Sequence, residues 1–277
     1  MTTKHFSAGV VLLPLALALA ALLLAGCPTL NNLTSAVGGG STQNTTPPKQ
    51  ADNQPTSDQG QTQAQVPSGS ALAYQYQFSA FYAGFWSMGW FGYKDANYAP
   101  GQGTIWKFTS TGGKSKDPVI LERALLKVVP GNSQWWRFKM TTGKSNIVYE
   151  FLVGPDMVVT KVRYQDPGSG AIGEFVPSQD QMKPQPGTGA ANAPKSRAEM
   201  ANYLVGRENV QVAAGSFMAD HYLYTDDASS GTAESWVNEK VPGYMVKSIY
   251  TNKKNNQTST GELTQIESGV TTSLNSY

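Results

Sequence analysis

The 277-residue chain is poor in the side chains that most metal sites and many enzyme sites require. It contains one cysteine and two histidines, and charged residues make up only 14% of the sequence. One cysteine cannot form an internal disulfide, and scattered carboxylates with so few histidines do not supply three or four convergent metal ligands. We therefore expect no metal ion and no other cofactor.

Positive charge is also scarce. The formal net charge is +2, and lysine and arginine form no block anywhere in the chain. A protein that binds nucleic acid usually carries a basic patch or stripe that neutralises phosphates. The composition therefore argues against a nucleic-acid partner.

Motifs of catalysis are missing as well. The sequence Gly143-Lys144-Ser145 resembles the end of a phosphate-binding loop, but the first glycine of that motif would fall at Phe138. No Gly-x-Ser-x-Gly sequence occurs. A Ser-His-Asp site could be built on His221 with Asp226 or Asp227, although these two aspartates lie in a turn-forming stretch. We expect no enzymatic activity, and an envelope hydrolase that uses His221 is kept as an alternative.

Long apolar runs are limited to one, at residues 10–24, behind a short N-terminus that carries Lys4. A positive start, an apolar stretch and small residues at its end are the parts of a secretory signal. The run is shorter than the roughly 20 apolar residues that a membrane-spanning helix needs, and it contains Pro14. Residues 1–26 are therefore predicted to be a signal peptide.

The apolar run closes with Leu24-Ala25-Gly26-Cys27, which contains the only cysteine of the chain. This segment resembles the lipobox of prokaryotic lipoproteins. The resemblance implies that the Cys27 sulfur receives a diacylglyceryl group and that cleavage makes Cys27 the new N-terminus. One acyl chain anchors a protein only marginally, whereas two or more anchor it stably. We expect a protein held on the extracytoplasmic side of the cell envelope, at the outer membrane in a Gram-negative cell.

Residues 27–71 lack the apolar side chains of a folded core. The stretch is filled with Gly, Ser, Thr, Gln, Asn and Pro, and such a composition cannot bury enough apolar surface to offset chain entropy. We predict a disordered tether whose r.m.s. reach is roughly 35 Å. A folded domain is then expected over residues 72–277.

In the remaining chain, aromatic and aliphatic residues alternate with polar ones, which is typical of half-buried strands. The first such run places Tyr74, Tyr76, Phe78 and Tyr82 on one face of a predicted strand. Similar runs are found at residues 106–108, 136–140, 147–153, 157–164, 210–212, 217–224, 233–237, 244–250 and 262–267. Short turns between them favour an antiparallel meander.

One short helix is predicted after a Pro- and Gly-rich break at residues 176–194. Ser196 to Glu199 have the pattern of a capping box, Met200, Tyr203 and Leu204 form an apolar stripe, and Gly206 is a C-terminal stop signal. Together with ten or eleven strands, this predicts an all-β domain. Its sheet is large enough to curve into a half-open β-barrel.

Several stretches resemble uncharacterised bacterial domains related to the LolA/LolB-like lipoprotein-carrier superfamily. These are residues 215–217, 221–222, 236–237 and 241–247, together with a central meander from Arg123 through Trp136 to Phe151. The resemblance implies a strongly curved antiparallel sheet with an apolar concave side, closed by helices. In the carriers, that side holds acyl chains.

Aromatic residues supply the candidate site. An apolar pocket for a lipid or acyl chain is predicted to be lined by Tyr74, Tyr76, Phe78, Trp106, Phe108, Trp136, Phe138, Tyr149 and Phe151. The alternative is that these residues simply fill the core and that the domain has a structural role. A dense aromatic stretch with Trp86, Trp90 and Phe91 gives a further alternative, a surface assembly module that contacts a protein partner.

Overall fold

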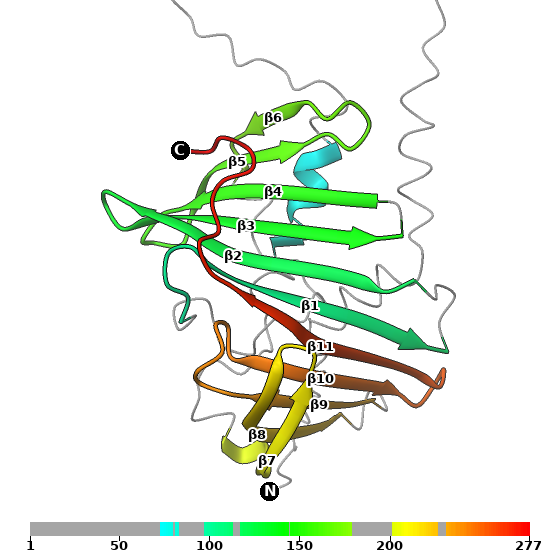
Figure 1. Cartoon of the computed structure of the whole chain (residues 1–277). Coiled ribbons are helices and arrows are strands. Elements are labelled where there is room, and N and C mark those ends of the chain that lie inside the picture. The colour runs from blue at the N-terminus through cyan, green and yellow to red at the C-terminus, as the bar shows by residue number, and fades with distance from the viewer. Residues whose placement is uncertain are drawn as a thin grey trace, which may run out of the picture.

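The computed structural model describes residues 73–79, 81–82, 97–112, 117–143, 145–178, 201–226 and 231–277. Its main feature is one antiparallel sheet of eleven strands in the order β6-β5-β4-β3-β2-β1-β11-β10-β9-β8-β7 (Figure 1). Strands β6 and β7 form the two free edges, so the sheet is open. The prediction of a curved, half-open antiparallel sheet with one short helix is confirmed.

The strands have the following bounds: β1 (Gln102–Thr111), β2 (Val119–Val129), β3 (Ser133–Thr142), β4 (Ser145–Val153), β5 (Val159–Gln165), β6 (Ile172–Phe175), β7 (Leu204–Val212), β8 (Gly215–Asp226), β9 (Gly231–Val237), β10 (Met245–Asn252) and β11 (Gln257–Glu267). Consecutive strands pair with each other, except β6 and β7, which lie at opposite edges, and the first and last strands also meet. There β1 pairs with β11, with Trp106 opposite Leu263. Two meanders, β1 to β6 and β7 to β11, are thus joined at the centre of the sheet by the pairing of β1 with β11.

The segment predicted as the first strand is a helix over residues 73–79 and 81–82. Tyr74, Phe78 and Tyr82 are four residues apart, so they share one face of a helix as well as one face of a strand. Tyr76 also belongs to the strand pattern, but on the helix it points away and is 63% exposed. The correction arises because a spacing of four residues fits both periods.

The helix predicted around residues 196–206 is also wrong over its described part. Residues Ala201–Tyr203 form a single 3-10 turn, η3, and Leu204 begins strand β7. The segment pairs with β8 through a two-residue turn, and this tertiary pairing outweighs the local capping signal. The alternation also left out β2, which is buried on both faces, and the short β6.

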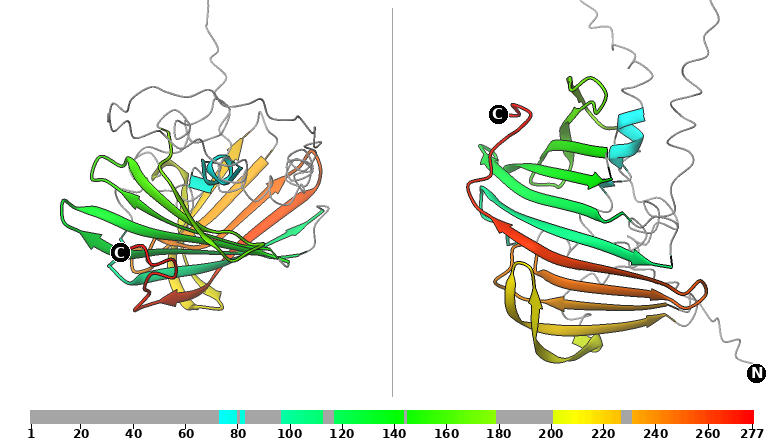
Figure 2. Two further views of the ribbon diagram at one scale, coloured as in Figure 1. Left: turned by 90° about the horizontal axis from the view of Figure 1, so that it is seen from above. Right: turned by 45° about the vertical axis from the view of Figure 1, so that its right-hand side comes forward.

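The sheet curves around the helix, which lies on its concave face (Figure 2). The concave face carries Trp106, and the register across β1, β2 and β3 places Leu121 and Met140 on the same side. The chain after β11 crosses the opposite, convex face. The part of the apolar core formed by β3 to β6 therefore lies between the concave face and the helix.

Several predicted features lie outside the described residues. These are the signal peptide, the lipobox with Cys27, the tether and the aromatic stretch with Trp86, Trp90 and Phe91. In the part of the chain described above, no helix is both long and apolar enough to cross a membrane.

Candidate functional site

The aromatic residues of β1, β3 and β4 form one continuous apolar face. Cross-strand register places Trp136 opposite Phe151 and Phe138 opposite Tyr149, so each pair projects to the same side of the sheet. Trp106 and its neighbour two residues on, Phe108, extend this face along β1. All six side chains are buried in the main core.

The helix fills this face with its own aromatic side chains. The Phe78 ring lies 5.3 Å from the Tyr149 ring and 5.4 Å from the Phe151 ring, measured between centroids. The Phe81 ring lies 5.6 Å from that of Phe138. These distances and tilted orientations are those of favourable aromatic contacts. The helix therefore covers the concave face from β3 to β6, which Phe78 reaches at Phe175.

Polar contacts fasten the helix at its margins. The Tyr74 hydroxyl donates to Asp166 at 2.8 Å, and the Tyr149 hydroxyl donates to the Gln77 side chain at 2.6 Å. Burial raises the pKa of both tyrosines well above its ordinary value, and the bond to Asp166 adds to the effect at Tyr74. Backbone and side-chain hydrogen bonds from Ser169 lower the pKa of Asp166. At neutral pH the two hydroxyls are therefore protonated donors.

Seven of the nine residues predicted to line a pocket come together in the core, each at most 4% exposed. Tyr74 is partly buried at the edge of the cluster, and Tyr76 lies outside it. Phe81 and Phe175 belong to the same cluster but were not predicted from the sequence. The helical spacing of Phe81 from Phe78 was the signal that could have identified the first of them.

A buried cation lies at the other end of the aromatic face. The Arg123 guanidinium lies 5.1 Å from the Tyr98 ring and 5.3 Å from the Trp106 ring, and its Nε donates to the Tyr98 hydroxyl at 3.0 Å. Gly243 leaves room for it, because a Cβ there would lie 2.1 Å from an Arg123 nitrogen. Arginine stacked on aromatic rings keeps its charge in an apolar setting. Sequence reasoning assigned Arg123 no such place.

His221 lies on the convex face, in a row that also contains Trp236 on β9. Its Nε2 is 3.0 Å from a carboxylate oxygen of Glu234, and its Nδ1 is 3.2 Å from one of Glu208. The ring stacks on Trp236 with centroids 4.4 Å apart. Both ring nitrogens are thus directed at glutamates. The partners expected for His221 in a Ser-His-Asp site were instead Asp226 or Asp227. Asp226 is the last residue of β8, and Asp227 lies outside the described residues.

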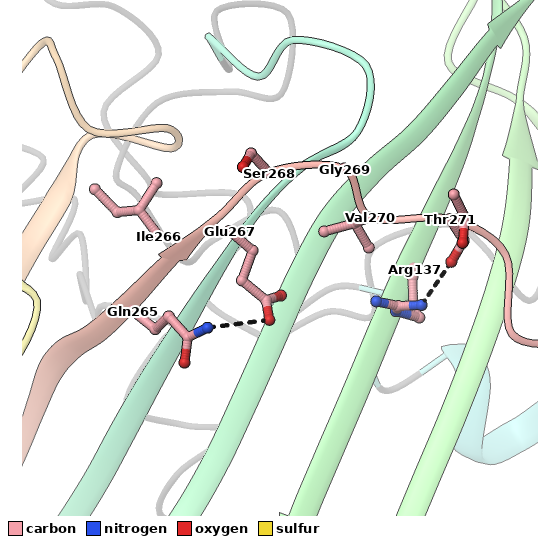
Figure 3. Close-up of a pocket in the computed structure, with 8 residues that line it drawn as sticks. All are labelled: Arg137, Gln265, Ile266, Glu267, Ser268, Gly269, Val270 and Thr271. Carbon is pink, nitrogen blue, oxygen red and sulfur yellow. Dashed lines mark hydrogen bonds between the residues drawn. The ribbon is translucent and has the colours of Figure 1, made fainter.

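An open polar depression of about 550 Å³ lies on the convex face where the chain leaves β11 (Figure 3). Its lining residues are Arg137, Gln265, Ile266, Glu267, Ser268, Gly269, Val270 and Thr271. Burial raises the pKa of Glu267, and the nearby Glu122 carboxylate adds to the rise. The described residues contain no group of three His, Cys, Asp or Glu side chains that could hold a metal ion.

No protein-family model matches the chain, and no curated protein matches it either. Similar solved structures include MucB in the Pseudomonas aeruginosa MucA/MucB complex, at 15% identity over 73% of this chain and 59% of that one, with a TM-score of 0.37. A DUF1329 family protein from Desulfovibrio piger aligns at 10% identity over 73% of this chain and 94% of that one, with a TM-score of 0.31. A Vibrio parahaemolyticus domain provisionally described as outer membrane lipoprotein-sorting aligns at 6% identity over 63% and 88%, with a TM-score of 0.25.

These matches show only a partial likeness. The chain spans less than three fifths of the MucB chains that it matches. The low TM-scores leave the assignment of function to the residues of this chain.

Proposed function

We propose that the protein is a lipid-anchored lipoprotein of the cell envelope whose concave face binds a lipid or acyl chain. In this proposal the helix at residues 73–79 and 81–82 is a removable cover, and the protein acts by binding rather than by catalysis. The predicted lipobox at Leu24 to Cys27 supports the anchor. The aromatic concave face supports the ligand class.

The observation that carries the proposal is the composition of that face beneath the helix. Trp136, Phe138, Tyr149 and Phe151 form a continuous apolar surface on rigid neighbouring strands. A lipid or acyl chain needs an apolar, largely preformed concave surface of this kind. The helix contributes the side chain of Phe78 and other aromatic rings to this surface, and the methylene groups of an acyl chain could replace those contacts.

The helix is suited to being displaced because little apart from its docking stabilises it. The described part of the helix is shorter than the about 12–15 residues below which isolated helices are marginal in water, so its order depends on the face against which it packs. Its polar attachments to the sheet are side-chain hydrogen bonds. They include Tyr74 to Asp166, Tyr149 to Gln77 and to the Tyr74 carbonyl, and the Tyr82 hydroxyl to the Met157 carbonyl at 3.3 Å. It also directly follows the predicted tether, so its release would not require a strand to leave the sheet.

A fluorescent fatty-acid titration tests this proposal. In a Phe78→Ala/Phe81→Ala variant the helix loses its two most deeply buried rings, and we expect the affinity for the fatty acid to rise about tenfold or more. Tyr76→Ala changes an exposed residue of the same helix and should leave the affinity unchanged. Leu126→Ala opens a cavity in a separate cluster around Trp135, and it controls for destabilisation alone.

The contrasting result would assign the face to a structural role. If the double variant stays folded and binds no more fatty acid than Leu126→Ala does, the rings only fill the core.

The surroundings of His221 favour binding over catalysis, because both of its ring nitrogens already contact glutamates.

A further inference from the structure

A row of alternating charges crosses the convex face from β2 to β6. It consists of Glu122, Arg137, Glu150, Arg163 and Glu174. Register pairs Arg137 with Glu150, Glu150 with Arg163 and Arg163 with Glu174, and Arg137 also forms an ion pair with Glu122 at 2.5 Å. The row is therefore positioned by the pairing of the strands themselves.

Glu150, at the centre of the row, is completely buried. Its ion pair with Arg137 is long, at 4.0 Å. Its oxygens instead accept four hydrogen bonds from the C-terminal segment, residues 268–277. The donors are the Thr272 hydroxyl at 2.5 Å, the Ser273 amide at 2.7 Å, the Ser273 hydroxyl at 3.1 Å and the Ser276 hydroxyl at 2.6 Å. One carboxylate thus binds three residues of this segment.

The two arginines beside Glu150 bind the backbone of the same segment. Arg137 donates to the Thr271 carbonyl at 2.9 Å, and Arg163 donates to the Asn275 carbonyl. Guanidinium groups flanking a carboxylate therefore contact backbone acceptors on either side of the hydroxyl donors. This arrangement recognises a short peptide by its backbone and by the positions of its hydroxyl groups.

A buried leucine, a cation–π contact and internal hydrogen bonds also hold the segment in place. Leu274 is only 1% exposed, and the Lys127 ammonium lies 4.6 Å from the centre of the Tyr277 ring. Within the segment, the Thr272 hydroxyl accepts hydrogen bonds from the amides of Leu274 and Ser276, at 3.2 and 2.9 Å. The segment is thus bound in a compact turn.

The C-terminal segment contributes no strand to the sheet. It leaves β11 after Glu267 and crosses the outside of the neighbouring strands without extending the ladder (Figure 1). A buried charged group adds little stability compared with apolar side chains of similar volume, but it discriminates strongly between partners that satisfy it and partners that do not. The C-terminal segment therefore resembles a ligand that binds to a surface formed by the paired strands.

We propose that the Arg137-Glu150-Arg163 row is a peptide-binding site, that the C-terminal segment occupies it in cis, and that it accepts Ser/Thr-rich peptides of the pattern Thr-Ser-Leu-x-Ser from partner proteins. This inference is independent of the lipid-binding proposal, because the two sites lie on opposite faces of the sheet. The cis segment has a high effective concentration and restricts access by such peptides.

Fluorescence polarisation of a labelled synthetic peptide of residues 268–277 tests the site. A shortened chain that ends at Glu267 should bind the peptide saturably. The complete chain should bind it at least about tenfold more weakly, because its own segment competes. In the shortened chain, Glu150→Gln should weaken binding by about tenfold or more, because the acceptor for three hydroxyls loses its charge. Glu262→Gln is the matched control. This carboxylate lies on β11 in an ion pair with Lys247, outside the row, and its loss should leave the affinity unchanged.

A folded, shortened chain that does not bind the peptide, or that binds a scrambled peptide equally well, would overturn the inference. If the shortened chain does not fold, the peptide is offered to the complete chain carrying Thr272→Ala/Ser276→Ala, whose own segment lacks two of the four donors to Glu150. Saturable binding there supports the site, and its absence contradicts it.

Discussion

Replacing Phe78 by alanine should release the helix from the sheet without unfolding the sheet. Phe78 is almost completely buried, and its ring contacts those of Tyr82, Tyr149, Phe151 and Phe175. Truncating a buried phenylalanine to alanine costs about 3–5 kcal/mol. Because that cost falls on the contact between helix and sheet, it should reduce the free energy of local opening of the helix.

Hydrogen exchange followed by mass spectrometry measures this effect region by region. A loss of about 3–5 kcal/mol corresponds to a roughly 10²- to 10⁴-fold faster exchange of the helix amides, limited by the rate of an unprotected helix. Amides of β3 should change far less, because their hydrogen bonds to β2 and β4 remain. Tyr76→Ala, on the exposed side, should change stability by less than about 0.5 kcal/mol.

A separately opening helix would be contradicted if helix and β3 amides accelerated together and by the same factor in Phe78→Ala. Such a result would mean that the helix opens only when the whole domain unfolds. The helix would then be an inseparable part of the core, and the concave face could not be uncovered by moving it.

Three further predictions concern other parts of the molecule. Cys27→Ser should abolish detergent-phase recovery in phase partitioning, and equal recovery of wild type and variant would remove the predicted lipid anchor. Glu267→Gln should raise the urea midpoint at pH 8 but not at pH 4. The raised pKa of Glu267 means that wild type loses stability as pH rises through that pKa, whereas the amide does not ionise; an equal effect at both pH values would contradict this. Gly243→Ala should cost about 2 kcal/mol or more, because its φ is +74° and the new methyl group would collide with Arg123, and an unchanged thermal midpoint would show that the collision is relieved.

The sequence predicted the sheet well because most strands have a solvated and a buried side. In β3 and β4, for example, the aromatic residues alternate with Arg137 and Glu150, and the turns between strands are short and rich in turn formers. The predicted aromatic cluster followed from the same alternation. Strand β2 was missed because it is buried on both faces and its adjacent charged residues, Glu122 and Arg123, lie on opposite sides, so no alternation marks it.

The helix and the convex face were harder to predict. Tyr and Phe favour strands, and a spacing of four residues between Tyr74 and Phe78 fits both a strand and a helix. The site around Glu150 depends on the pairing of β3, β4 and β5 and on the path of the last residues across them. No local pattern carries that information. Nothing in a Ser- and Thr-rich C-terminus distinguishes a bound segment from a free one.

The central claim is that the concave face takes a lipid or acyl chain when the helix leaves it, and native mass spectrometry tests it most directly. The protein should carry Cys27→Ser, so that no anchor lipid is attached, and should be exported and purified without organic solvent. Native mass spectrometry then measures the bound lipid, which is extracted afterwards. We predict a non-covalent acyl lipid on the Phe78→Ala/Phe81→Ala form in larger amount than on the form with an intact helix. Folded protein of both forms without bound lipid, even after incubation with fatty acid, would contradict the claim.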